Sequence, residues 1–94
     1  MKTIHKLHLE RTTEVQNIKL PESGRPLRVD FILQDRTLQM WVEVDADTVI
    51  GTSDTVRRFK IFQTGAGIPD NAEYVGTAVD VIKPDAFHVY ELVD

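Results

Sequence analysis

The chain has 94 residues, no cysteine and a formal net charge of −4. This length fits one domain over residues 1–94, and the lack of cysteine excludes a disulfide framework, a thiolate zinc site and a cysteine nucleophile. The acidic excess argues against general nucleic-acid binding, and neither a membrane-spanning apolar run nor a basic-then-apolar leader is present, so we expect no membrane association and no export.

Apolar and polar residues alternate with period two along most of the chain, which predicts an all-β protein. The alternating segments, in chain order, are residues 3–9, 14–20, 27–33, 37–44, 57–62, 74–81 and 87–92. About seven short strands separated by turn residues predict a small antiparallel sandwich or a partly open barrel.

The clearest unit is a β-hairpin made by the two segments around the polar residues 34–36. The pattern places two apolar sets on one face of this hairpin: Leu27, Val29, Phe31 and Leu33 on the first strand, and Leu38, Met40, Val42 and Val44 on the second. Residues 45–55 and 64–71 are predicted to be loops. Helix is the competing interpretation for 45–49, but β-branched residues and Gly51 disfavour it.

Large apolar side chains also occupy the opposite phase of several strands, which an ordinary one-sided sheet would leave polar. These side chains are Ile32, Trp41, Phe62, Tyr90 and Leu92. Because a patch of this kind is larger than monomers usually expose, we expect it to be covered. A second sheet or loop of the same chain, a homo-oligomer interface, and a ligand or foreign protein are the three interpretations.

No pattern of catalytic or metal-binding residues stands out. The groups considered are His5, His8, His88, Asp45, Asp47, Asp54, Ser23 and Ser53. His5 and His8 are three apart on a predicted strand and so point to opposite faces, the aspartates lack the spacing of an EF-hand, and neither serine lies in a nucleophile elbow. We therefore expect no enzyme, no metal and no cofactor.

A basic strand running into a glycine-rich loop is the strongest candidate for ligand binding. Backbone N–H groups of such loops can cradle an anion, and arginine grips phosphate bidentately. The spacing matches neither the dinucleotide fingerprint nor a P-loop. The candidate residues for an anion or a nucleotide are Arg58, Lys60, Thr64, Gly65 and Gly67.

Six short motifs carry a resemblance over nearly the whole chain. They are Met1-Lys2-Thr3-Ile4-His5-Lys6, Met40-Trp41-Val42-Glu43-Val44-Asp45, Phe59-Lys60-Ile61-Phe62-Gln63-Thr64-Gly65, Ile68-Pro69-Asp70, Tyr74-Val75-Gly76-Thr77 and Phe87-His88-Val89-Tyr90-Glu91. In this order the chain resembles a family of short proteins of tailed bacteriophages and prophages, classed as a domain of unknown function. Residues 66–68 read Ala-Gly-Ile where that family has His-Pro-Ile, so no role that needs a loop histidine is expected.

The resemblance implies a phage origin and action in the cytoplasm of the bacterial host. By analogy with other small acidic phage proteins, we expect a non-catalytic accessory protein that binds a host factor, including a component of antiviral defence, and self-associates. The expected protein-binding residues are Trp41, Phe62 and Tyr90 as apolar anchors and Arg57, Arg58 and Lys60 as charges. The alternatives are a small-ligand sponge that sequesters a nucleotide signal and a minor structural component of the virion.

Overall fold

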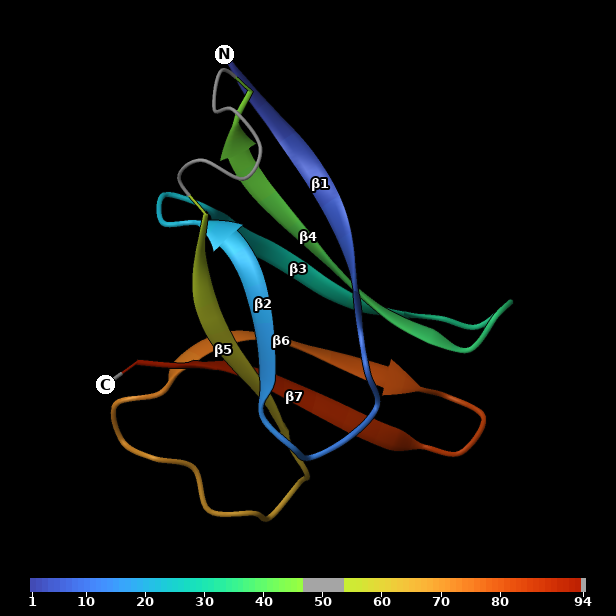
Figure 1. Cartoon of the computed structure of the whole chain (residues 1–94). Coiled ribbons are helices and arrows are strands. Elements are labelled where there is room, and N and C mark those ends of the chain that lie inside the picture. Colours follow the sequence, from blue (N-terminus) through green and yellow to red (C-terminus); the bar gives the residue numbers. More distant parts are fainter. Residues whose placement is uncertain (47–53, 94) are drawn as a thin grey trace.

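The computed structural model describes residues 1–46 and 54–93 (Figure 1). These residues form seven β-strands and no helix. The strands are β1 (Lys2–Leu9), β2 (Gln16–Pro21), β3 (Arg25–Ile32), β4 (Thr37–Asp45), β5 (Asp54–Phe62), β6 (Glu73–Asp80) and β7 (Asp85–Leu92). The all-β class is confirmed, and so is the position of each alternating segment, although β5 begins within the predicted 45–55 loop.

The strands form two antiparallel sheets that pack as a sandwich and do not close into a barrel. Sheet A has the order β1-β4-β3 and sheet B the order β2-β5-β7-β6. Figure 1 shows sheet A above sheet B, with the β3–β4 and β6–β7 turns at the same end of the molecule. The predicted hairpin over residues 34–36 is confirmed as the β3–β4 pair.

The core lies between the facing sides of the two sheets, where the period-two pattern places its apolar residues. All four predicted inward positions of β4 are buried, with at most 5% exposure. The core consists of Leu9, Leu20, Val29, Phe31, Leu38, Met40, Val42, Val44, Phe59, Ile61, Ala78 and Val89.

Leu27 and Leu33 are the two exceptions to the predicted face of β3. The register of β3 against β4 shifts between Pro26 and Arg28. This bulge displaces Leu27 from the inward phase and leaves it 40% exposed, while Leu33 lies beyond the end of the strand and is 42% exposed. The prediction that both share the buried face of Val29 and Phe31 is therefore wrong.

Strands β3 and β6, the edges of the two sheets on one side, lie against each other. β6 carries its own register shift, between Tyr74 and Gly76. A Cβ atom at Gly76 would lie 3.4 Å from the backbone nitrogen of Val29, so the two strands are in van der Waals contact at this point. The two bulged edges thus shield one another.

An ion pair joins the two hairpin turns and so the two sheets. Arg36, in the β3–β4 turn at a φ of 55°, donates a hydrogen bond to Asp80 at the end of β6. Burial alone raises the pKa of Asp80, but the hydrogen bonds from Arg36 and from the backbone amides of Ile82 and Lys83 outweigh it and hold the pKa below its ordinary value. Asp80 is therefore a charged group that the fold stabilises.

Candidate functional site

The outward side of sheet B collects aromatic, cationic and hydroxyl side chains from three strands. Residues directly opposite each other in an antiparallel pair share a face, so the register assigns this side: Lys60, Tyr90 and Tyr74 form one row, and Phe62, His88 and Thr77 the next. Arg58, opposite Leu92, extends it along β5. We call this surface the aromatic face: Arg58, Lys60, Phe62, Tyr74, Thr77, His88 and Tyr90.

Three rings form the centre of the aromatic face. The ring centroids of Tyr90 and Phe62 lie 5.6 Å apart in an edge-to-face arrangement, and those of Tyr90 and Tyr74 lie 5.3 Å apart. The Lys60 ammonium lies 5.2 Å from the centroid of Phe62, within the range of a cation–π contact. Tyr74 is 61% exposed, so its ring, held against Tyr90, is open to solvent.

A chain of hydrogen bonds fixes the polar side of the aromatic face. The hydroxyl of Thr64 lies 2.8 Å from Nε2 of His88, and Nδ1 of His88 lies 3.1 Å from the hydroxyl of Thr77. The Thr77 hydroxyl in turn lies 2.7 Å from the Tyr74 hydroxyl. Each imidazole nitrogen of His88 therefore has a hydroxyl partner, which fixes this ring on both sides. The Tyr74 hydroxyl, at the end of the chain, is held by Thr77.

The structure brings together four of the six residues predicted to bind a protein. Arg58, Lys60, Phe62 and Tyr90 all lie on the aromatic face. Phe62 is 5% exposed, so the chain itself covers this ring, whereas Tyr90 is half-buried. Burial of the second phase by the same chain, the first of the three predicted interpretations, therefore holds for Phe62.

Trp41 lies on the other broad side of the molecule. In β4 it alternates with the buried Met40 and Val42, so it points away from sheet B, and its register partners are Lys6 on β1 and Arg28 on β3. The indole is half-buried. Trp41 and the aromatic face cannot contact the same flat surface of a partner.

Arg57 points inward and is engaged within the fold. Its guanidinium donates to both carboxylate oxygens of Glu91 at 2.6 and 2.8 Å, and to the carbonyl oxygens of Pro21 and Gly24 at 3.2 and 2.6 Å. The hydrogen bonds to Glu91 raise the pKa of Arg57 against the effect of burial. We call this arrangement the Arg57 clamp, because it ties β5 and β7 to the β2–β3 turn.

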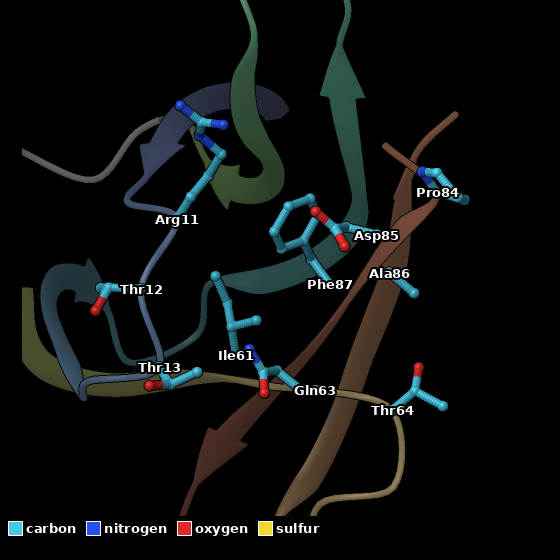
Figure 2. A pocket seen from close by; sticks show the side chains of 10 residues that line it. All are labelled: Arg11, Thr12, Thr13, Ile61, Gln63, Thr64, Pro84, Asp85, Ala86 and Phe87. Carbon is cyan, nitrogen blue, oxygen red and sulfur yellow. The ribbon is translucent and has the colours of Figure 1, made fainter. Parts of the chain in front are cut away.

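The predicted ligand loop borders a groove between the 10–15 connection, the end of β5 and the start of β7 (Figure 2). The groove has a volume of about 650 Å³. Figure 2 shows Ile61 and Phe87 in its middle, with Arg11 on one side and Thr64 on the other. Gly65, at a φ of 90°, and Gly67 are exposed nearby. Thr64 thus lines the groove and also forms a hydrogen bond with His88 of the aromatic face.

The metal and nucleophile candidates are dispersed. His5 opposes Val42 and His8 opposes Gln39, so they lie on opposite faces of sheet A, and His88 lies on sheet B. In residues 1–46 and 54–93 no three His, Cys, Asp or Glu side chains are grouped as metal ligands would be. Asp47 and Ser53 fall outside the described residues. Residues 1–46 and 54–93 also contain no helix that is long enough and apolar enough to span a membrane.

Sequence reasoning missed Tyr74, Thr77 and His88 as members of the site. Without the bulge at Val75, the hairpin register would place Val75 opposite Tyr90 and turn Tyr74 toward Glu91. The bulge moves Tyr74 onto the side of Tyr90. Thr77 and His88 lie between the bulge and the β6–β7 turn. A simple hairpin register for the last two predicted segments is therefore enough to pair them.

Comparison with known proteins places the chain in a family. Residues 1–94 match the family described as Domain of unknown function (DUF7352). The chain belongs to the DUF7352 family. No curated protein and no solved structure matches this DUF7352 chain. The resemblance to a domain of unknown function is therefore confirmed at the level of the family.

Proposed function

We propose that this DUF7352 protein is a non-catalytic binding protein that docks its aromatic face on an acidic surface of a partner protein. In the setting that the sequence resemblance suggests, the protein comes from a phage, and the partner is a factor of the bacterial host, met in the host cytoplasm. An antiviral defence component is one such factor. Self-association of the chain belongs to the same proposal.

The observation that carries the proposal is the exposed, held ring of Tyr74 beside Tyr90 and Lys60. Tyrosine, tryptophan and arginine dominate the energetics of protein interfaces. Tyr74 is 61% exposed yet is fixed by a ring contact with Tyr90 and by its hydroxyl contact with Thr77. A side chain ordered before binding loses little conformational entropy when the partner arrives, which strengthens association.

The cationic side chains of the aromatic face favour a partner with an acidic surface. The chain carries a net charge of −4, but on the aromatic face the Lys60 ammonium lies over the Phe62 ring and Arg58 is a second cation on the same side of β5. A local positive patch on an acidic protein orients an acidic partner during encounter and disfavours other approaches.

The test is quantitative capture of proteins from a bacterial lysate by immobilised wild-type and variant proteins. We expect Tyr74→Ala and Lys60→Glu each to retain about tenfold less of the specific partner, as truncation of an interface hot spot costs more than about 1.4 kcal/mol. Lys83→Glu, at the exposed β6–β7 turn, is the matched charge control and should capture as wild type does. Circular dichroism confirms that each variant is folded.

Equal capture of the partner by wild type, Tyr74→Ala and Lys60→Glu would contradict the proposal. Trp41→Ala separates the two broad sides of the molecule: loss of capture with this variant alone would move the interface to the outward side of sheet A. A captured protein whose contact peptides, after cross-linking, lie away from β5, β6 and β7 would count against the aromatic face as well.

A small anionic ligand such as a nucleotide is the second candidate, because threonine hydroxyls line the groove of Figure 2 and Arg11 lies across it from Thr64. A ligand that binds only the native state stabilises it by about 2.7 kcal/mol at one hundred times its Kd. We expect a nucleotide of the right kind to raise the melting temperature of wild type and to do so less for Arg11→Ala. A panel of nucleotides without any shift would exclude this candidate.

A further inference from the structure

β1 is the outermost strand of sheet A, and its outer edge pairs with no other strand in the part of the chain that the structure describes. All eight residues of β1 are in register with β4, without a bulge. Most of its side chains are exposed on both faces. A long, regular edge of this kind presents a row of backbone donors and acceptors to another extended chain.

The other three edge strands are protected, which makes β1 different. β3 carries Pro26 and a bulge, and β6 carries a bulge, and these two edges lie against each other. β2 is shorter than β1 and ends at Pro21. Proline, bulges, mutual covering and charged side chains, lysine above all, are the devices by which proteins block unwanted strand addition. β1 has only the last of these: its lysines disfavour a cationic strand but leave the edge open to an acidic one.

The chemistry of β1 selects for acidic segments. Lys2, His5, Lys6 and His8 are its ionisable residues, and β1 contains no carboxylate although the whole chain is acidic. Lys6 is exposed and lies in register with Trp41, whose other register partner is Arg28. On this outward side Lys2 pairs with Glu43 at 3.4 Å and Arg28 with Asp30 at 3.2 Å, so Lys6 is the cation that the edge offers beside Trp41.

We propose that the free edge of β1 binds an extended acidic segment of a partner protein, which adds to sheet A as a fourth strand. Main-chain hydrogen bonds hold such a strand, and alternate side chains give selectivity. A glutamate or aspartate of the segment faces Lys6, next to the Lys2–Glu43 ion pair. A second copy of the chain is a poor occupant, because β1 against β1 brings lysines and histidines together.

The test uses a fluorescein-labelled peptide of alternating glutamate and threonine, of the same length as β1, with a lysine–threonine peptide as its control. We expect saturable fluorescence anisotropy with the acidic peptide only. Amide hydrogen exchange of β1, followed by NMR, should slow on binding while that of β6 does not change. Lys6→Glu should weaken binding about tenfold through like-charge repulsion, and Lys83→Glu should leave it unchanged.

Tyr74→Ala distinguishes this surface from the aromatic face and should bind the peptide as wild type does. Loss of peptide binding in Tyr74→Ala, equal binding by Lys6→Glu and wild type, no binding of the acidic peptide, or slowed exchange outside β1 would each overturn the inference. Analytical sedimentation at the same protein concentration tests whether the β1 edge binds a second copy of the chain. A dimer that is lost in Lys6→Pro but kept in Lys83→Glu would assign the edge to self-association instead.

Discussion

Replacement of Arg57 with alanine is expected to lower the free energy of unfolding by roughly 3–5 kcal/mol, the usual cost of leaving a buried charge without its partner. In the Arg57 clamp the Arg57 and Glu91 side chains are 16% and 11% exposed. Removal of the guanidinium leaves the Glu91 carboxylate and the carbonyls of Pro21 and Gly24 without this donor. A small domain has about 5–15 kcal/mol in total, so the variant should be close to unfolding. Urea denaturation followed by circular dichroism measures the loss.

Two further variants show whether charge or geometry is responsible. Arg57→Lys keeps the positive charge but loses the fork that contacts both Glu91 oxygens, so we expect an intermediate loss. The double variant Arg57→Met with Glu91→Leu removes both charges and should recover most of the stability, as apolar replacements of buried ion pairs often do. A single Arg57→Ala variant within about 0.5 kcal/mol of wild type would show that the clamp behaves as a surface contact.

Asp80→Asn is expected to lower the melting temperature at pH 7, and the difference from wild type should disappear in acid. Asp80 is 1% exposed and its pKa lies below the ordinary value. A carboxyl group with a lowered folded-state pKa contributes stability above its unfolded pKa of about 3.9, and this contribution is lost as the pH falls through the folded-state pKa. Asparagine keeps the shape but cannot form the ion pair with Arg36.

The measurement is the melting temperature of both proteins from pH 7 down to about pH 2, since all other carboxyl groups are shared and cancel in the difference. Asp70→Asn, at an exposed loop position, is the matched control and should follow wild type at every pH. A gap between Asp80→Asn and wild type that stays constant over this range would contradict a charged Asp80.

The strands and the core follow from the alternation of side chains alone. Leu38, Met40, Val42 and Val44 share a phase and are all buried. The same alternation also indicates the Arg57 clamp. Arg57 is in phase with the buried Phe59, and Glu91 is in phase with the buried Val89. Opposite charges at two inward positions of neighbouring strands are a signal of a buried ion pair.

The bulges are what alternation could not predict. One extra residue inverts the phase of everything beyond it, so Leu27 leaves the core and Tyr74 joins Tyr90 on the aromatic face. Nor does a strand pattern reveal which strands share a sheet. The placement of β4 in sheet A and of β5 and β7 in sheet B puts Trp41 and the predicted partners Phe62 and Tyr90 on opposite sides of the molecule.

The interleaved strand order has a consequence for the assembly of the chain during synthesis. β2 leaves the ribosome between the strands of sheet A, but its hydrogen-bonding partner, β5, lies beyond residue 53. All three strands of sheet A lie within residues 2–45, while β2 must wait for β5. Such distant pairings are the slow steps of folding, so the nascent protein carries an unmatched β2 until β5 has been synthesised.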